Sequence, residues 1–182
     1  MAVFVLGAGA TRGASFVDPC KTSCLPPLDA DFFTQLQRVS NQKHKGLIDA
    51  VIADTVDLFG VNFRATLETT FTTLEHTIKM VSATKETRDF NKDELQKKRN
   101  RLLQALAAVM EEALTEQSEA GGASLSPQAC KHHARFVSEI LKRGDEIICF
   151  NYDCLIDYTL RDQGAGKWNP RYGYGFKLGA RG

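Results

Sequence analysis

Two short polar segments, far apart in the chain, carry the residue types best suited to ligand binding and chemistry. The first, Gly7-Ala8-Gly9-Ala10-Thr11, follows the apolar run Val3–Leu6, and the second, Asn151-Tyr152-Asp153, follows the apolar run Ile147–Phe150. Each apolar run is typical of a buried parallel strand, and open α/β sheets bind ligands at the carboxyl ends of such strands. We therefore expect the two segments to meet in one site.

The residue types in these segments indicate recognition of a nucleotide. Gly7 and Gly9 let a backbone turn sharply and let its amides approach an anion such as a pyrophosphate, although a tight turn without ligand remains the alternative. The Asn151 amide can bind ribose hydroxyls or orient water, and the Asp153 carboxylate accepts hydrogen bonds. Either side chain could instead cap a following helix. A full Gly-x-Gly-x-x-Gly fingerprint is absent because Arg12 stands where the third glycine is needed, which disfavours an ordinary NAD dehydrogenase.

Composition excludes several classes of protein. The chain has 182 residues, of which 43% are hydrophobic, and its 23 basic and 22 acidic residues give a net charge of +1, so we expect no nucleic acid partner. With neither a signal peptide pattern nor a long apolar span, we expect a cytoplasmic protein without membrane contact. The five cysteines have no metal-site spacing, so we expect reduced thiols and no metal.

The segment between the two apolar runs is predicted to be almost entirely helical. Apolar spacing predicts helices over 29–39, 45–59, 67–81, 91–120 and 126–143, with Gly60 and Gly144 as stops. The proline-containing stretch 15–28 is predicted as a loop, with a lid over the site favoured over a passive connection. The predicted fold class is α/β, with a single domain over 1–182. We expect a Rossmann-like parallel sheet from about 1–28 and 144–182 and a helical insertion over about 29–143. Because two strands alone make too small a parallel sheet, we expect a third strand at 172–178 or a continuation beyond 182 that completes the domain.

The motifs together resemble a known family. Gly7-Ala8-Gly9-Ala10-Thr11, the following Pro26-Pro27-Leu28-Asp29-Ala30-Asp31-Phe32-Phe33, and Phe150-Asn151-Tyr152-Asp153-Cys154-Leu155-Ile156-Asp157 are similar to the sirtuin-like NAD-binding domains of bacterial defence and related systems. The resemblance implies that Gly7, Ala8, Gly9, Ala10 and Thr11 bind the cofactor phosphates. It implies that Asn151 holds the ribose or positions the attacking water, and that Asp153 holds the nicotinamide amide.

The activity that this resemblance implies is hydrolysis of NAD at the nicotinamide–ribose bond, as in antiphage defence, with Asn151 and Asp153 as catalytic residues. The alternatives are a non-catalytic module that senses a nucleotide and forms a homo-oligomer or serves a sensor domain, and an NAD-dependent deacylase, which the lack of two CxxC pairs disfavours. The family places a general-base histidine after the Asn-x-Asp motif, and this chain has none after His133. We expect His76, His132 and His133 to be surface or packing residues.

Overall fold

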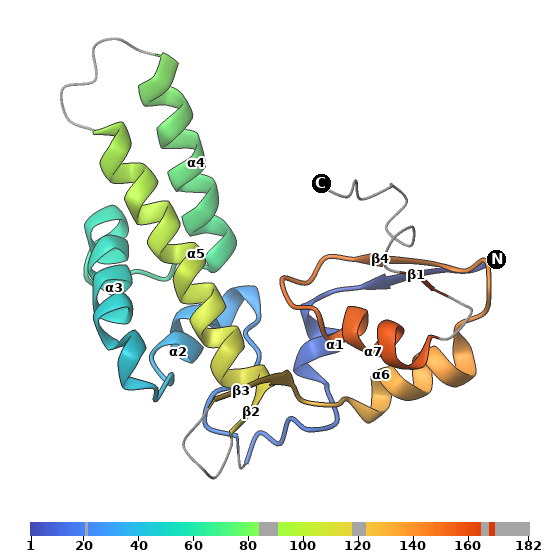
Figure 1. Ribbon diagram of the computed structural model, residues 1–182. Helices are drawn as coiled ribbons and strands as arrows, with labels where there is room; N and C mark the ends of the chain where they lie inside the picture. The colour runs from blue at the N-terminus through green and yellow to red at the C-terminus, as the bar shows by residue number, and fades with distance from the viewer. Residues whose placement is uncertain (21, 84–90, 118–122, 165–167, 170–182) are drawn as a thin grey trace, which may run out of the picture. The chain divides into compact units, whose positions relative to one another are not determined.

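The computed structural model describes residues 1–20, 22–83, 91–117, 123–164 and 168–169 (Figure 1). The chain divides into two compact units. The sheet unit combines 1–21 with 115–182, and the helical unit is the continuous segment 22–114. Both polar segments singled out above therefore belong to the sheet unit.

The centre of the sheet unit is a parallel pair of strands, β1 (Val3–Leu6) and β4 (Glu146–Cys149). Val3 lies opposite Glu146 and Leu6 lies opposite Cys149. The pairing continues past both strands, because the Phe150 amide donates to the Leu6 carbonyl at 2.9 Å. Parallel strands in register end at the same edge, so the segments after Leu6 and after Cys149 start side by side, as expected from the sequence.

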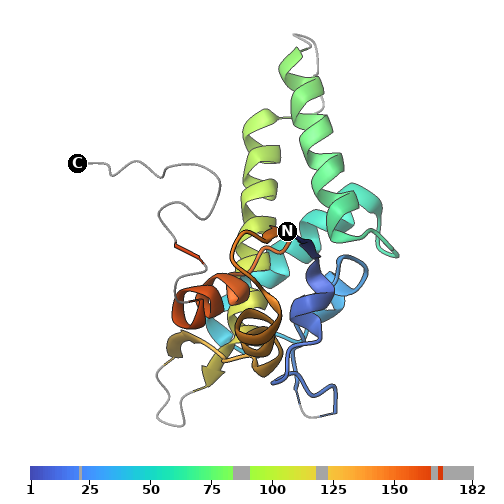
Figure 2. The same ribbon diagram turned by 90° about the vertical axis from the view of Figure 1, so that its right-hand side faces the viewer.

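One face of this strand pair is covered by short helices (Figures 1 and 2). They are α1 (Ala8–Arg12), α6 (Lys131–Arg135) with its π-helical continuation η3 (Phe136–Ile140), and α7 (Leu155–Gln163). The core between them consists of Val137, Leu141, Ile156 and Leu160, against which Phe4, Leu6, Ile147 and Trp168 pack. The helix predicted from Ser126 begins later than expected, at Lys131, because Ser126 and Pro127 lie in a strand.

The expected Rossmann-like sheet is wrong. In the described parts of the chain, the parallel sheet has only two strands, and the other sheet is the small antiparallel pair of β2 (Thr115–Gln117) and β3 (Ala123–Pro127). Val5 is 64% exposed and Ile148 is 45% exposed, so β1 and β4 are covered on one face, whereas apolar runs had suggested burial on both. The predicted strand at 172–178 lies outside the described residues.

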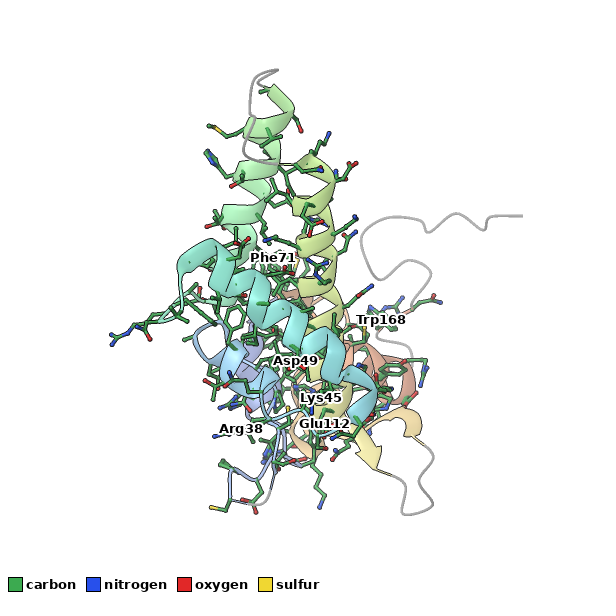
Figure 3. All side chains as sticks on the ribbon, turned by 90° about the vertical axis from the view of Figure 1, so that its left-hand side faces the viewer. Arg38, Lys45, Asp49, Phe71, Glu112 and Trp168 are labelled. Atoms are coloured by element: carbon green, nitrogen blue, oxygen red, sulfur yellow. The ribbon has the colours of Figure 1, made fainter. Side chains whose placement is uncertain are left out.

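The helical unit is built around one long helix, α5 (Lys92–Leu114). The helices α3 (Lys45–Phe59) and α4 (Leu67–Ala83) pack against α5, and Figure 3 shows α3 with Lys45 and Asp49 on it. The shorter elements are η1 (Asp29–Asp31), α2 (Phe32–Leu36) and η2 (Gln42–His44). The bounds of α3 match the predicted helix 45–59, and Gly60 ends it with a φ of 85° that disfavours other residues. None of the helices in the described ranges is long and apolar enough to cross a membrane.

The basic run on α5, Gln96–Arg101, is engaged in ion pairs within the helical unit. Arg101 donates two hydrogen bonds to Asp54 on α3, at 2.6 and 2.8 Å, which raise the pKa of the guanidinium. Lys98 forms an ion pair with Asp57, which also lies on α3. These ion pairs join α5 to its neighbours, and cations that are already paired are poorly suited to binding phosphates.

The second half of the predicted lid is packed inside the helical unit. Cys24 is 1% exposed and Leu25 is 6% exposed. The Leu25 amide donates to the Gln35 side chain at 2.9 Å, and Gln35 itself is 2% exposed on α2. A segment with buried side chains and a buried hydrogen bond is anchored to its unit. Residues 24–27 therefore do not form a loose lid in this structure.

Candidate functional site

The hydroxyl of Thr11 joins the two polar segments of the sheet unit. Thr11 Oγ1 donates to Asp153 Oδ2 at 2.6 Å and accepts from Asn151 Nδ2 at 2.9 Å. Thr11 is 2% exposed and Asp153 is 9% exposed, so the bond between them is buried. Three of the residues selected from the sequence thus form one hydrogen-bonded cluster, which we call the Thr11 cluster (Thr11, Asn151 and Asp153).

Strand pairing explains why this cluster forms. Thr11 lies in α1, immediately after β1, and Asn151 and Asp153 lie in the turn after β4. Because the two strands are parallel and in register, α1 and this turn leave the sheet at the same edge. Residues separated by 142 positions in the chain are thereby brought to hydrogen-bonding distance.

Asp153 also holds the beginning of α7. Its Oδ1 accepts from the backbone amide of Leu155, the first residue of α7, at 3.0 Å. The sequence analysis considered that Asp153 caps a following helix, and this bond to the first amide of α7 is such an interaction. The other carboxylate oxygen, Oδ2, accepts from the Thr11 hydroxyl. Asp153 couples the orientation of α7 to that of the cluster, because a single carboxylate serves both.

Asn151 has an acceptor without a partner. Its Nδ2 donates to Thr11, whereas its Oδ1 is buried and has no hydrogen-bond partner among the described residues. A buried carbonyl oxygen without a partner loses its hydration without compensation, at a cost of about 1–3 kcal/mol. This atom is suited to accept a hydrogen bond from a bound group.

The glycine turn leaves open space beside the backbone. Gly7 has extended dihedrals and precedes α1, and the Ala10 amide donates to the Gly7 carbonyl at 2.8 Å. A Cβ atom added at Gly7 or Gly9 would meet nothing within 4 Å, and neither residue has a positive φ. Packing and backbone conformation thus do not demand glycine at these positions, and Ala8 between them is the first residue of α1.

His133 is a site neighbour that the sequence reasoning assigned to surface or packing. It lies on α6, is 7% exposed, and neither ring nitrogen has a hydrogen-bond partner in the described structure. Burial lowers the pKa of His133, and the charge of Asp153 and the Ala10 carbonyl oppose this shift. His133 lies at helical spacing from the buried residues Cys130 and Val137, and this spacing is the sequence pattern that indicated a buried position for His133.

This burial predicts an acid-sensitive fold. The pKa of His133 in the folded chain lies below the ordinary value of 6.5, so the unfolded chain binds the proton more tightly. The contribution of neutral His133 is therefore complete above pH 6.5 and is lost as the pH falls through the lower, folded-state pKa. We expect urea unfolding at pH 7.5 and pH 5.5 to show a smaller loss of stability in His133→Phe than in the unsubstituted protein. The exposed neighbour His132 offers the control, because His132→Phe should lose as much stability between the two pH values as the unsubstituted protein. The same loss in all three proteins would contradict the prediction.

The cysteines next to the cluster are poor candidates for nucleophiles. Burial is the main cause that raises the pKa of both the Cys149 and the Cys154 thiol, and Asp153 and Asp157 raise both further. Among the described residues, no group of three His, Cys, Asp or Glu side chains is arranged to hold a metal ion.

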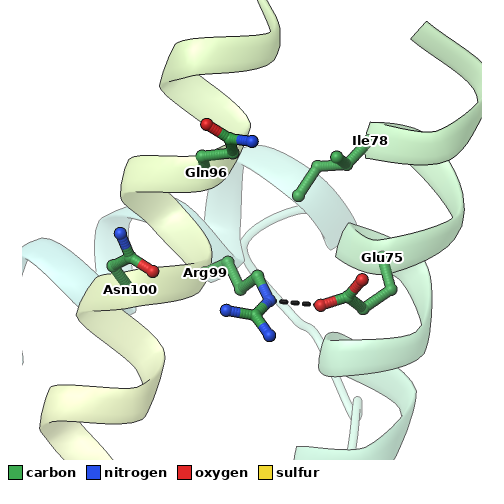
Figure 4. A pocket seen from close by; sticks show the side chains of 5 residues that line it. All are labelled: Glu75, Ile78, Gln96, Arg99 and Asn100. Atoms are coloured by element: carbon green, nitrogen blue, oxygen red, sulfur yellow. Dashed lines mark hydrogen bonds and ion pairs between the residues drawn. The ribbon is translucent and has the colours of Figure 1, made fainter. Parts of the chain in front are cut away.

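A separate pocket of about 290 Å³ lies between α4 and α5 in the helical unit (Figure 4). Its lining is mostly polar and consists of Glu75, Ile78, Gln96, Arg99 and Asn100. Arg99 and Glu75 pair with each other across it, so the two opposite charges already compensate one another.

Comparisons of the whole chain with models of protein families, with curated proteins and with solved structures found no match.

Proposed function

We propose that the sheet unit binds NAD and hydrolyses the bond between nicotinamide and ribose. The observation that carries this proposal is the Thr11 cluster, in which the polar residues following two parallel strands meet through one buried and one partly buried hydrogen bond. The sequence motifs resemble those of sirtuin-like NAD-binding domains, and the open space beside Gly7 and Gly9 suits the close approach of a diphosphate.

The chemistry required of the protein is modest. Cleavage of the nicotinamide–ribose bond passes through a transition state with positive charge on the ribose, and a positioned carboxylate or amide oxygen stabilises such charge. Asn151 Oδ1 is the unpartnered oxygen that can accept from a ribose hydroxyl or from the attacking water. Asp153 supplies negative charge beside it and, through Thr11, holds the Asn151 amide in place.

A second candidate is a nucleotide-sensing module that assembles without consuming NAD. It is favoured by the apolar side chains left exposed on and after the strands, among them Val5 at 64% and Phe150 and Tyr152 at 71%. Large exposed apolar side chains on and just after a strand pair are a feature of surfaces that contact other proteins. This candidate shares the NAD site and differs only in whether the nicotinamide–ribose bond is broken.

Thermal unfolding with NAD tests the site that both candidates share. At 100 times its Kd, NAD is expected to stabilise the fold by about 2.7 kcal/mol, which corresponds to a rise in Tm of roughly 5–10 °C. The Asn151→Ala variant should lose this rise, because it lacks the Oδ1 atom that is proposed to accept a hydrogen bond from a ribose hydroxyl. Chromatography of the same mixtures for free nicotinamide separates hydrolysis from binding alone.

The matched control is Asn62→Ala, an exposed asparagine of the helical unit, which should keep the full rise in Tm. A rise of the same size in Asn151→Ala would remove Asn151 from the site. If NAD leaves the Tm of the unsubstituted protein unchanged, the proposed function is wrong. Binding without nicotinamide release would favour the sensing module.

A further inference from the structure

The strand pair of the sheet unit has an apolar face that points away from the core. Side chains alternate along β1 and β4, and those on the inner face pack against the core under the helices. On the other face, Val5 lies opposite Ile148 in the strand register, and the Phe150 amide continues the pairing beyond β4. The side chains on this face are between 45% and 71% exposed. We call them the outer face: Val3, Val5, Ile148 and Phe150.

An outer face of this kind is unusual for parallel strands. Parallel sheets are normally covered on both faces, because both faces of their strands are apolar. Here α1, α6 and α7 lie on the inner side of the strand pair (Figure 1), and the outer side chains stay exposed among the described residues. Contiguous exposed apolar side chains mark surfaces that contact another molecule.

The charges on the strands restrict what can cover the outer face. Of the described residues in β1 and β4, Glu146 is the one with a charged side chain, and it lies at the end of the face, opposite Val3. Nucleic acid or an anionic membrane would need cations there, and these strands carry none. The centre of a protein interface is poor in charge, so an apolar protein face fits this composition.

The size of the outer face favours a second copy of the same chain as its partner. The outer face and Tyr152, which adjoins it in the sequence, expose roughly 300–550 Å² of apolar side chain per copy. Two such faces together bury roughly 600–1,100 Å², which reaches the lower limit of about 1,000 Å² for a specific interface. A second copy supplies a face of this size and composition, and two-fold pairs of identical faces are the commonest oligomers of soluble proteins.

We propose that two copies of this chain pack outer face against outer face, with a two-fold axis near Val5 and Ile148. When the strands of the two copies run antiparallel, their Glu146 carboxylates lie at opposite rims, so that no like charges meet. Because the buried area is small, the dimer is reversible, with a Kd of roughly 1–100 µM. This inference does not depend on NAD binding, and it gives either candidate function a defined assembly surface.

Sedimentation equilibrium of the unsubstituted chain, without NAD, tests the dimer itself. The concentrations extend from roughly tenfold below to tenfold above the expected range of Kd. We expect the average mass to rise from that of one chain to that of two chains and to stop there. The mass of one chain at every concentration would overturn the inference. So would a mass that keeps growing past two chains, because a closed two-fold pair has no face left for a third copy.

A charged substitution tests the position of the interface. Val5→Lys places a charge at the centre of the outer face, and we expect the dimer to weaken at least about tenfold, because two like charges would be buried together. The matched control is Val61→Lys, the same change at a valine of the helical unit that is 82% exposed, and it should keep the original Kd within about twofold. An unchanged Kd in Val5→Lys would overturn the inference.

A measurement without any substitution protects the test against a variant that fails to fold. In NMR spectra of the unsubstituted chain, the methyl resonances of Val3, Val5 and Ile148 should shift as the concentration rises, and those of exposed Val61 should stay in place. Shifts confined to other residues would place the contact elsewhere and overturn the inference. A monomer whose outer-face methyls are protected from a soluble paramagnetic probe would also overturn it, since another segment of the same chain would then cover the face.

Discussion

Replacing Asp153 with alanine is expected to lower the free energy of unfolding by about 2–4 kcal/mol. One carboxylate makes two buried hydrogen bonds, to the Thr11 hydroxyl at 2.6 Å and to the Leu155 amide at 3.0 Å. The first is a charge-assisted bond, typically worth about 1.5–3 kcal/mol, and the second caps α7, typically worth about 1 kcal/mol. Urea unfolding monitored by circular dichroism measures the loss. If the sheet unit binds NAD as proposed, this binding should disappear in the same variant, since the Thr11 hydroxyl would no longer be held.

Two further variants make this prediction specific. In Asp153→Asn the amide oxygen can still accept from Leu155, so we expect a smaller loss of about 1 kcal/mol. Asp162→Ala removes an exposed aspartate from the last turn of the same helix, where it pairs only with Arg161 in the described contacts, and should change stability by less than about 0.5 kcal/mol. If Asp153→Ala is no more costly than Asp162→Ala, the buried cluster does not exist in solution.

Replacing Phe32 with alanine is expected to destabilise the helical unit by about 3–5 kcal/mol, the range typical of a buried phenylalanine. Phe32 is 0% exposed at the start of α2, and its ring meets that of Phe33 edge to face at 5.1 Å. The ring of Phe33 in turn packs edge-on against that of Phe63, with 5.1 Å between the ring centroids. Truncation at Phe32 therefore removes one end of a row of three aromatic rings. The loss combines the transfer free energy of the ring with the cavity it leaves.

Two signals help to distinguish the units. Circular dichroism follows the helices of both units, the longest of which lie in the helical unit. Trp168, the single tryptophan of the chain, packs against the core of the sheet unit and reports its unfolding by fluorescence. Val61→Ala is the matched control, since Val61 is 82% exposed and should lose less than about 0.5 kcal/mol. A loss in Phe32→Ala as small as that of Val61→Ala would mean that Phe32 is not a core residue.

Local patterns in the sequence were sufficient for β1 and β4, for several helices and for the meeting of the two polar segments, but not for β2 and β3. The bounds of α3 and the start of α5 after Asn91, whose side chain accepts from the Asp93 amide, depend on contacts within one turn of helix. The convergence of Thr11 with Asn151 and Asp153 depends on a general rule, that parallel strands end at a common edge. Each of these features is decided by residues close together in the chain or by a constraint common to all sheets.

Only the tertiary structure decided the fold class and the full surroundings of the cluster. The apolar runs at β1 and β4 have the composition of strands buried on both faces, yet Val5 and Ile148 are exposed, because the number of strands and their cover depend on contacts between distant segments. The helices α2, α3 and α4 pack on α5, with Asp54 and Arg101 joined across α3 and α5, and the apolar stripe of a helix does not show which element it packs against. The sequence assigned His133 to a surface or packing role, and its burial follows from how α6 packs, because the partners of a side chain across space have no local signature in the chain.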